Sequence, residues 1–144
     1  MIVRLVFLAS LFLLAGCKRD SIYVRSEYIN HNRLASVHVG TPDYHKAEPF
    51  YGKQIIVRWN IPANCYTPGH CTMMLSVLSG DYTQIKVPIT IDCQRGTYIY
   101  RMMNCDYTQY QGILTYKVEL FCDDTLIEQW THHTWADWID IEPS

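Results

Sequence analysis

The sequence predicts an all-β fold, a single sandwich of about seven short strands. Apolar residues alternate with polar ones from Arg33 onward, and Gly, Pro, Asn and Asp interrupt this alternation at short intervals. No window long enough to form a helix has a helical period. Apolar residues make up 49% of the 144-residue chain, enough for one buried core, and the length fits one domain. A small barrel is an alternative arrangement of the same strands.

The predicted sandwich covers residues 33–144, and RLASVHVG at residues 33–40 is its first strand. In GKQIIVRWNIP, one parity is apolar and predicts the core face: Ile55, Val57, Trp59 and Ile61. Pro62 ends this strand because proline has no N–H for the ladder. In QIKVPITID the core face is Ile85, Val87, Ile89 and Ile91. Pro88 has the opposite parity, which predicts an edge strand or a bulged one.

The later strands follow the same period. In GILTYKVELFC the predicted core face is Leu114, Tyr116, Val118, Leu120 and Cys122, with Thr115, Lys117 and Glu119 outside. CTMMLSVLS, GTYIYRMM and TLIEQW complete the set.

Two of these stretches resemble the fibronectin type III and immunoglobulin-like superfamily. VRWNIP at residues 57–62 is similar to its early strand with a core tryptophan, and LTYKVEL at residues 114–120 to its penultimate strand with a core tyrosine. The immunoglobulin pattern of one Cys on each sheet around a Trp is not clearly present. The resemblance implies a Greek-key sandwich, with a C2-like sandwich as an alternative.

The N-terminus has the pattern of a secretory signal peptide, residues 1–16. Arg4 precedes a ten-residue apolar run, Leu5 to Leu14, whereas a membrane-spanning helix needs about 20 residues. The run ends in Leu14-Ala15-Gly16-Cys17, which resembles the lipobox of bacterial lipoproteins. An ordinary signal peptide with Cys17 by chance is the alternative.

The lipobox resemblance implies that Cys17 carries a diacylglyceryl group and becomes the first mature residue. Two or more acyl chains give stable membrane anchoring. Lys18 stands where the family's inner-membrane proteins carry aspartate, so the outer membrane is the implied location. Residues 17–32 are polar and mixed in charge, which predicts a flexible tether, although Ile22, Tyr23 and Val24 are an alternative edge strand.

A further resemblance concerns the whole chain. The lipobox, the Cys- and Tyr-rich β domain and strings such as RGTYIYRMMN and GILTYKVELF are similar to small uncharacterised lipoproteins of chlamydia-like bacteria. This resemblance implies an envelope rich in cysteine cross-links.

Five cysteines remain besides Cys17, and an exported compartment permits disulfides. The sequence does not fix the pairing, but spacing favours Cys65–Cys71 around a Pro-Gly loop and Cys93–Cys105 around a hairpin arm. Cys122 is then a free thiol, either buried in the core or available for an intermolecular bridge.

Motifs for catalysis are absent: the sequence has no Gly-rich phosphate loop, no HExxH and no Gly-x-Ser-x-Gly. Without residues 1–16 the chain has 11 basic and 14 acidic side chains, a net charge of −3, with no basic stripe for nucleic acid. We therefore expect no enzyme, no cofactor beyond the lipid on Cys17, and no metal. The alternative is a metal-binding protein or accessory enzyme that uses Cys65, His70 and Cys71, or His132, His133 and Asp137.

Tyrosine is abundant, with 11 residues. Several fall in predicted loops or strand ends, where they form a candidate binding surface or border the core: Tyr44, Tyr66, Tyr82, Tyr107 and Tyr110. The sequence thus predicts a non-enzymatic envelope lipoprotein, held to the membrane by its lipid, that binds other envelope proteins or has a structural role.

Overall fold

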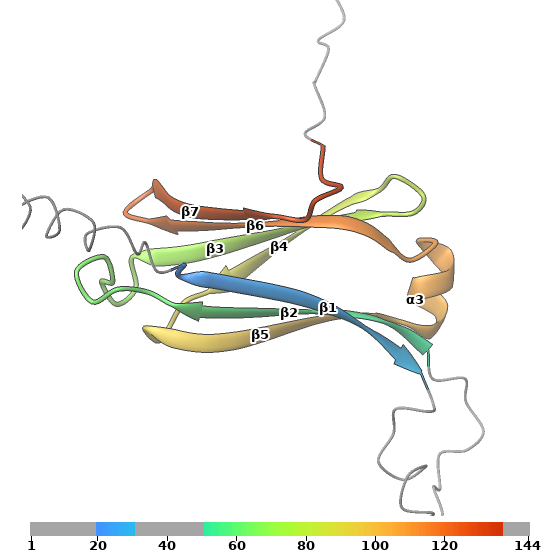
Figure 1. Ribbon diagram of the computed structural model, residues 1–144, viewed down its shortest axis with the longest axis horizontal. Coiled ribbons are helices and arrows are strands. Elements are labelled where there is room, and N and C mark those ends of the chain that lie inside the picture. Colours follow the sequence, from blue (N-terminus) through green and yellow to red (C-terminus); the bar gives the residue numbers. More distant parts are fainter. Residues whose placement is uncertain (1–19, 31–50, 137–144) are drawn as a thin grey trace, which may run out of the picture.

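Two antiparallel sheets lie face to face in the computed structural model, which describes residues 20–30 and 51–136 (Figure 1). The elements are β1 (Ile22–Asn30), β2 (Tyr51–Asn60), β3 (Cys71–Ser79), β4 (Gln84–Thr90), β5 (Arg95–Met103), α3 (Asn104–Gln109), β6 (Ile113–Cys122) and β7 (Thr125–Thr131). One sheet has the order β1-β2-β5 and the other β4-β3-β6-β7. The all-β prediction is confirmed, because the seven strands form two antiparallel sheets of a β-sandwich.

The core lies between the sheets and is built from the inward parity of each strand. In β2, Ile55 and Val57 are fully buried and Trp59 is half-buried, as the alternation predicts. Ile61, just beyond the strand, is also fully buried. The other central members come from the four-stranded sheet: Met73, Leu75, Val77, Ile89, Val118 and Leu120.

Pro88 lies on β4, at one edge of the four-stranded sheet. This position confirms the edge-strand prediction, because a proline in an inner strand would remove a ladder hydrogen bond.

The alternation in β6 is interrupted near its start, and two predictions there are wrong. The register shifts between Leu78 and Ser79, which pair with Thr115 and Ile113. Leu114 is the extra residue of this bulge and is 49% exposed, whereas Thr115 is 1% exposed. A bulge adds one residue to one strand and so reverses parity on one side of it. Ile113 consequently occupies the buried position predicted for Leu114.

Residues 22–30 form a strand, so the prediction of a flexible tether over residues 17–32 is wrong for this part. β1 pairs with β2 along its whole length, from Ile22 opposite Trp59 to Asn30 opposite Tyr51. The backbone N–H groups of Ser21 and Ile22 also donate to the Glu128 carboxylate on β7, with N···O distances of 2.8 and 3.4 Å. The sandwich therefore begins at Ile22, not at residue 33, and the edge-strand alternative for Ile22, Tyr23 and Val24 holds. The predicted strand at residues 33–40 and the signal peptide lie outside the described residues.

Candidate functional site

A shallow pocket of about 450 Å³ lies at the end of the sandwich where β1 begins. It opens on the outer face of the β1-β2-β5 sheet, the face turned away from the core. Asp20, Tyr23, Arg58, Trp59, Asn60 and Arg95 are among its lining residues.

The register of the three strands places these side chains together. Arg58 pairs with Tyr23 on one side and with Thr97 on the other, so the three form one row across the sheet. Asn60 and Arg95 form the next row, where Arg95 Nε donates to Asn60 Oδ1 at 2.7 Å. Both arginines are exposed. The pocket thus presents two guanidinium groups from neighbouring rows.

Trp59 forms the inner wall of the pocket. Its indole N–H donates to the Cys93 carbonyl at 2.9 Å, and its ring lies over Gly96, where a Cβ atom would clash with it. Glycine at position 96 therefore allows the ring to lie flat against β5.

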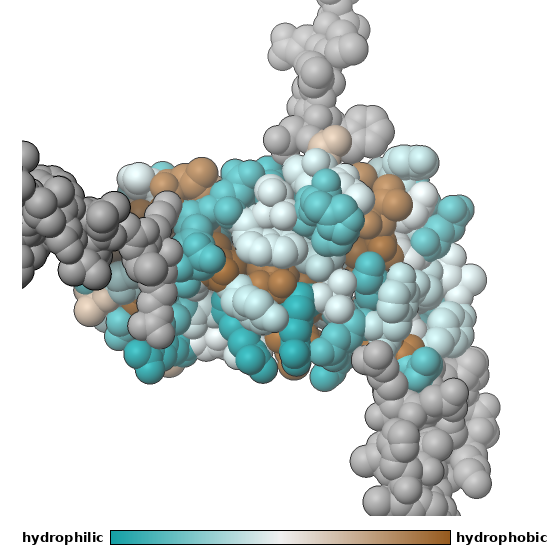
Figure 2. Space-filling model, in the orientation of Figure 1, coloured by the Kyte–Doolittle hydropathy of each residue, from teal (hydrophilic) through white to brown (hydrophobic). Residues whose placement is uncertain are grey.

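The outer face of this sheet carries an excess of basic side chains. All four arginines of residues 20–30 and 51–136 lie on it: Arg25, Arg58, Arg95 and Arg101. Glu27 is the acid among them, and it contacts Arg25 Nη2 at 3.2 Å and accepts from Gln54 Nε2 at 3.1 Å. Arg101 Nε donates to Gln54 Oε1 at 3.3 Å. This polar network fixes Arg25 and Arg101, while Arg58 and Arg95 face the pocket. Hydrophilic side chains gather along the lower rim of Figure 2, over these strands.

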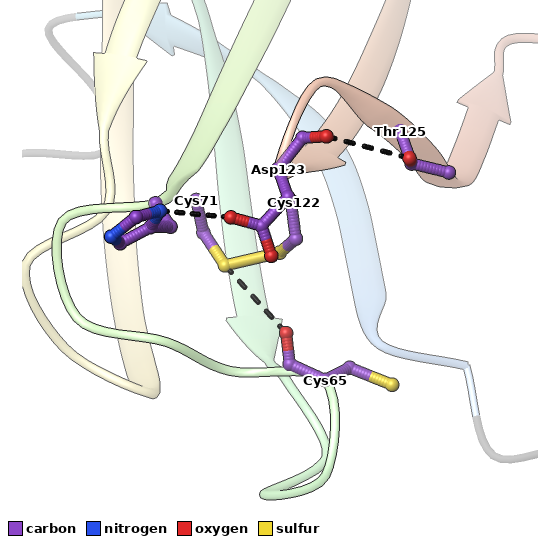
Figure 3. A network of polar contacts seen from close by, with 6 residues as sticks. Cys65, Cys71, Cys122, Asp123 and Thr125 are labelled. Carbon is purple, nitrogen blue, oxygen red and sulfur yellow. Dashed lines mark hydrogen bonds and ion pairs between the residues drawn. A yellow bond between two sulfur atoms is a disulfide. The ribbon is translucent and has the colours of Figure 1, made fainter.

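The cysteine pairs differ from those predicted. Cys71 is bonded to Cys122, its register partner on the neighbouring strand β6, with Cα atoms 4.2 Å apart. This spacing is close to that of a non-hydrogen-bonded antiparallel pair. Cys65 lies in the loop before β3, and its sulfur points away from the disulfide (Figure 3). The predicted Cys65–Cys71 pair and the predicted free Cys122 are therefore both wrong.

Cys93 and Cys105 are exposed free thiols, so the predicted bridge between them is also wrong. The residues between them form no hairpin: they contain the single strand β5, followed by α3. Nine extended residues span about 30 Å, far beyond the reach of a disulfide.

The metal alternative for Cys65, His70 and Cys71 loses a ligand, because the Cys71 thiol is taken up in the disulfide. His70 Nδ1 instead lies 2.8 Å from Oδ1 of Asp123, the residue that follows Cys122. Within residues 20–30 and 51–136, no three His, Cys, Asp or Glu side chains are grouped to hold a metal ion.

Of the second predicted cluster, Asp137 lies outside the described residues. The rings of His132 and His133 are 4.1 Å apart, and His132 also packs against Tyr116, at 5.0 Å between ring centroids. Burial, then the neighbouring His133 and Lys53, lower the pKa of His132. The two histidines follow β7 directly and extend an aromatic group in which Tyr116 on β6 stacks on Trp130 on β7.

The predicted tyrosines do not form one surface. Tyr66 lies near the pocket end of the sandwich, where its hydroxyl donates to the Asp92 carbonyl at 2.9 Å. Tyr107 and Tyr110 are partly buried against the core at the opposite end, which carries α3, and Tyr110 O accepts from Asp81 N beside the exposed Tyr82. Tyr44 lies outside the described residues.

Sequence reasoning missed two further tyrosines at the α3 end, Tyr28 and Tyr51. They are 61% and 38% exposed, and the Tyr51 ring meets the Tyr107 ring edge to face at 6.1 Å. Their position in strands, rather than in loops, concealed them. With Tyr82 they form what we call the tyrosine end: Tyr28, Tyr51 and Tyr82.

A buried lysine also lies near this end. Lys53 on β2 is 8% exposed, its Nζ donates to the Ile113 carbonyl at 3.4 Å, and it lies 5.3 Å from the centroid of the Tyr28 ring. Burial lowers the pKa of Lys53 below its usual 10.5. Burial of the charged Lys53 ammonium group therefore lowers the stability of the folded state.

Replacement of Lys53 by methionine is expected to raise the free energy of unfolding at pH 7 by about 1 kcal/mol, because no charge is then buried. The unfolded chain binds the Lys53 proton more tightly than the folded chain does, so the free energy of unfolding of the wild type rises as the pH approaches 10.5. The difference in stability between the wild type and Lys53→Met therefore narrows. Urea unfolding of both proteins at pH 7 and pH 9 measures this. Lys86→Met, at an exposed position on β4, is the control and should change stability by less than about 0.5 kcal/mol. A Lys53→Met variant less stable than wild type would contradict the prediction.

Among the described residues, no helix is long and apolar enough to cross a membrane. Comparison of the chain with protein-family models, with curated proteins and with solved structures finds no match in any of the three.

Proposed function

We propose that this chain is a lipoprotein of the bacterial envelope, anchored through acylated Cys17, whose β-sandwich binds or scaffolds other envelope proteins without catalysis. The observation that carries the proposal is Leu14-Ala15-Gly16-Cys17, placed directly at the end of the apolar run Leu5 to Leu14. Lys18 at the next position favours the outer membrane.

The place where the sandwich begins supports a close attachment to the membrane. β1 starts at Ile22, five residues after Cys17, and five extended residues span at most about 18 Å. The pocket end would then face the membrane, and the tyrosine end would point away from it.

The disulfide supports an exported location. Cys71 and Cys122 are bonded across neighbouring strands, and such bonds persist mainly in oxidising compartments.

The tyrosine end supports a binding role. Tyr28, Tyr51 and Tyr82 are exposed at the end of the sandwich that would reach other envelope proteins. Tyrosine is enriched in protein interfaces because it offers a large rigid area with a polar tip. The exposed thiols of Cys93 and Cys105 would allow covalent cross-links to such partners as well.

Labelling with a palmitate analogue in a bacterial host tests the anchor. Wild type is expected to incorporate the label and Cys17→Ser to lose it. Cys93→Ser is the matched control, because it removes an exposed thiol elsewhere and should keep the label. Label that persists in Cys17→Ser, or that wild type never acquires, would refute the proposal.

A further inference from the structure

We propose that the basic outer face of the β1-β2-β5 sheet docks on an anionic phospholipid surface, with one lipid phosphate held between Arg58 and Arg95. The inference deepens the proposed function and rests on it for the choice of ligand. The group that the two arginines would bind is a phosphate ester, and we propose that a lipid headgroup carries it.

The charge distribution is the first argument. The chain is acidic overall, with a net charge of −2, yet all four arginines of its described residues lie on this one face. Glu27 is balanced by Arg25, and Asp20 in the lining of the pocket offsets one of the other three arginines, so the face keeps a net excess of two positive charges. Such a face attracts anionic lipids, since each basic side chain near the surface strengthens binding about fivefold.

The pocket supplies the phosphate site. A guanidinium group donates two parallel N–H bonds to phosphate oxygens, and Arg95 is oriented for this by its 2.7 Å bond from Nε to Asn60. Arg58 makes no ion pair within residues 20–30 and 51–136, so its guanidinium is available to a ligand. Thr97, next to Arg58 in the row, adds a hydroxyl group.

The aromatic residues of the pocket also suit a lipid interface. Tyr23 is 57% exposed beside Arg58, and Trp59 forms the inner wall. Tyr and Trp are enriched at the level of lipid headgroups, where one side of the ring is apolar and the other wet.

The position of the pocket relative to Cys17 completes the argument. Asp20, a lining residue, follows Cys17 by three residues, which span at most about 11 Å. An acylated Cys17 would therefore hold the pocket at headgroup depth, and Lys18 and Arg19 would add two positive charges beside it.

Energy transfer in vesicles tests the inference on the full chain as it is purified from the membranes of a bacterial host. A donor dye is placed on Cys93, two residues before β5 and near the pocket, with Cys65→Ser and Cys105→Ser removing the other free thiols. The acceptor is a dye on lipid headgroups, in vesicles of phosphatidylcholine alone or with added phosphatidylglycerol. We expect transfer in both, and stronger transfer with phosphatidylglycerol because the basic face docks.

Arg58→Gln with Arg95→Gln is expected to lower the ratio of docked to undocked protein about 25-fold, about fivefold for each arginine. The matched control, Lys86→Gln on the opposite sheet, should change this ratio less than twofold. Arg58→Lys with Arg95→Lys keeps the positive charge but loses the paired N–H bonds, so its docking should lie between that of wild type and that of the double Gln variant. Glycerol 1-phosphate in solution should compete only at high concentration, because it lacks the surrounding anionic surface.

The outcomes separate the two proposals. Transfer that is equal in both kinds of vesicle, or unchanged by the double Gln variant, overturns the docking inference and leaves the anchor intact. Transfer with phosphatidylglycerol alone, and none with phosphatidylcholine, refutes the anchor and supports the basic face. Competition by glycerol 1-phosphate at equal strength in both vesicles would assign the site to a soluble phosphate ester and overturn the lipid source.

Discussion

Truncation of Leu120 to alanine is expected to lower the free energy of unfolding by about 2–5 kcal/mol. Leu120 is fully buried on β6, opposite Met73 of β3 in the same sheet, and belongs to the core cluster between the sheets, so the variant loses apolar contacts and leaves a cavity. Urea denaturation followed by tryptophan fluorescence measures the change.

Leu114→Ala is the matched control on the same strand. Leu114 is 49% exposed at the bulge, so its truncation should change stability by less than about 0.5 kcal/mol. Unbroken alternation along β6 would instead place both leucines in the core. Equal losses for the two variants would therefore contradict the bulge and the inner face described for β6.

Removal of the disulfide by Cys71→Ala with Cys122→Ala is expected to cost about 4 kcal/mol. The bond closes a loop with a sequence separation of 51 residues, and the loss of unfolded-chain entropy gives this magnitude. Reductant should destabilise wild type by a similar amount and leave the double variant unaffected. Urea denaturation with and without reductant makes the comparison.

Cys65→Ala is the control for this prediction, because its thiol is free and points away from the bond. It should keep the full sensitivity to reductant. The opposite result would contradict the Cys71–Cys122 bond. In that case reductant would no longer destabilise Cys93→Ala with Cys105→Ala but would still destabilise Cys71→Ala with Cys122→Ala, as the Cys93–Cys105 pair predicted from sequence spacing requires.

The sequence predicts the fold class well because the alternation of apolar and polar residues within a strand reflects which of its side chains are buried. In β2, Ile55 and Val57 have the inner parity and are fully buried, and Arg58 has the outer parity and is exposed. Ile56 between them is the exception, because it has the outer parity and is only 6% exposed. Pro88 likewise identifies an edge strand from a local property, its missing N–H group.

Features that depend on pairing between strands could not be predicted in this way. The bulge at Leu114 arises from the register of β6 against β3, and the Cys71–Cys122 bond joins residues that are neighbours in that register alone. Spacing along the sequence favours bonds between cysteines that are close in the chain, and so it predicts the pairs Cys65–Cys71 and Cys93–Cys105. The composition of residues 22–30 predicts a tether because β1 is an edge strand with only two buried side chains, Ile22 and Val24.

The basic face was concealed for the same reason. Its arginines are scattered from position 25 to position 101, and no run of positive charge marks them in the sequence. Three strands bring them together, with Tyr23, Arg58 and Thr97 in one row. The pocket can be predicted only when the order and register of the three strands are known, because these decide which side chains lie side by side.

The most direct test of the anchored-lipoprotein account is the intact mass of the protein purified from the membrane, with peptide mapping of its N-terminus. The account predicts a chain that begins at Cys17 and carries the added mass of a diacylglyceryl group on this residue. A chain that begins elsewhere, or a Cys17 peptide without lipid, would contradict the account.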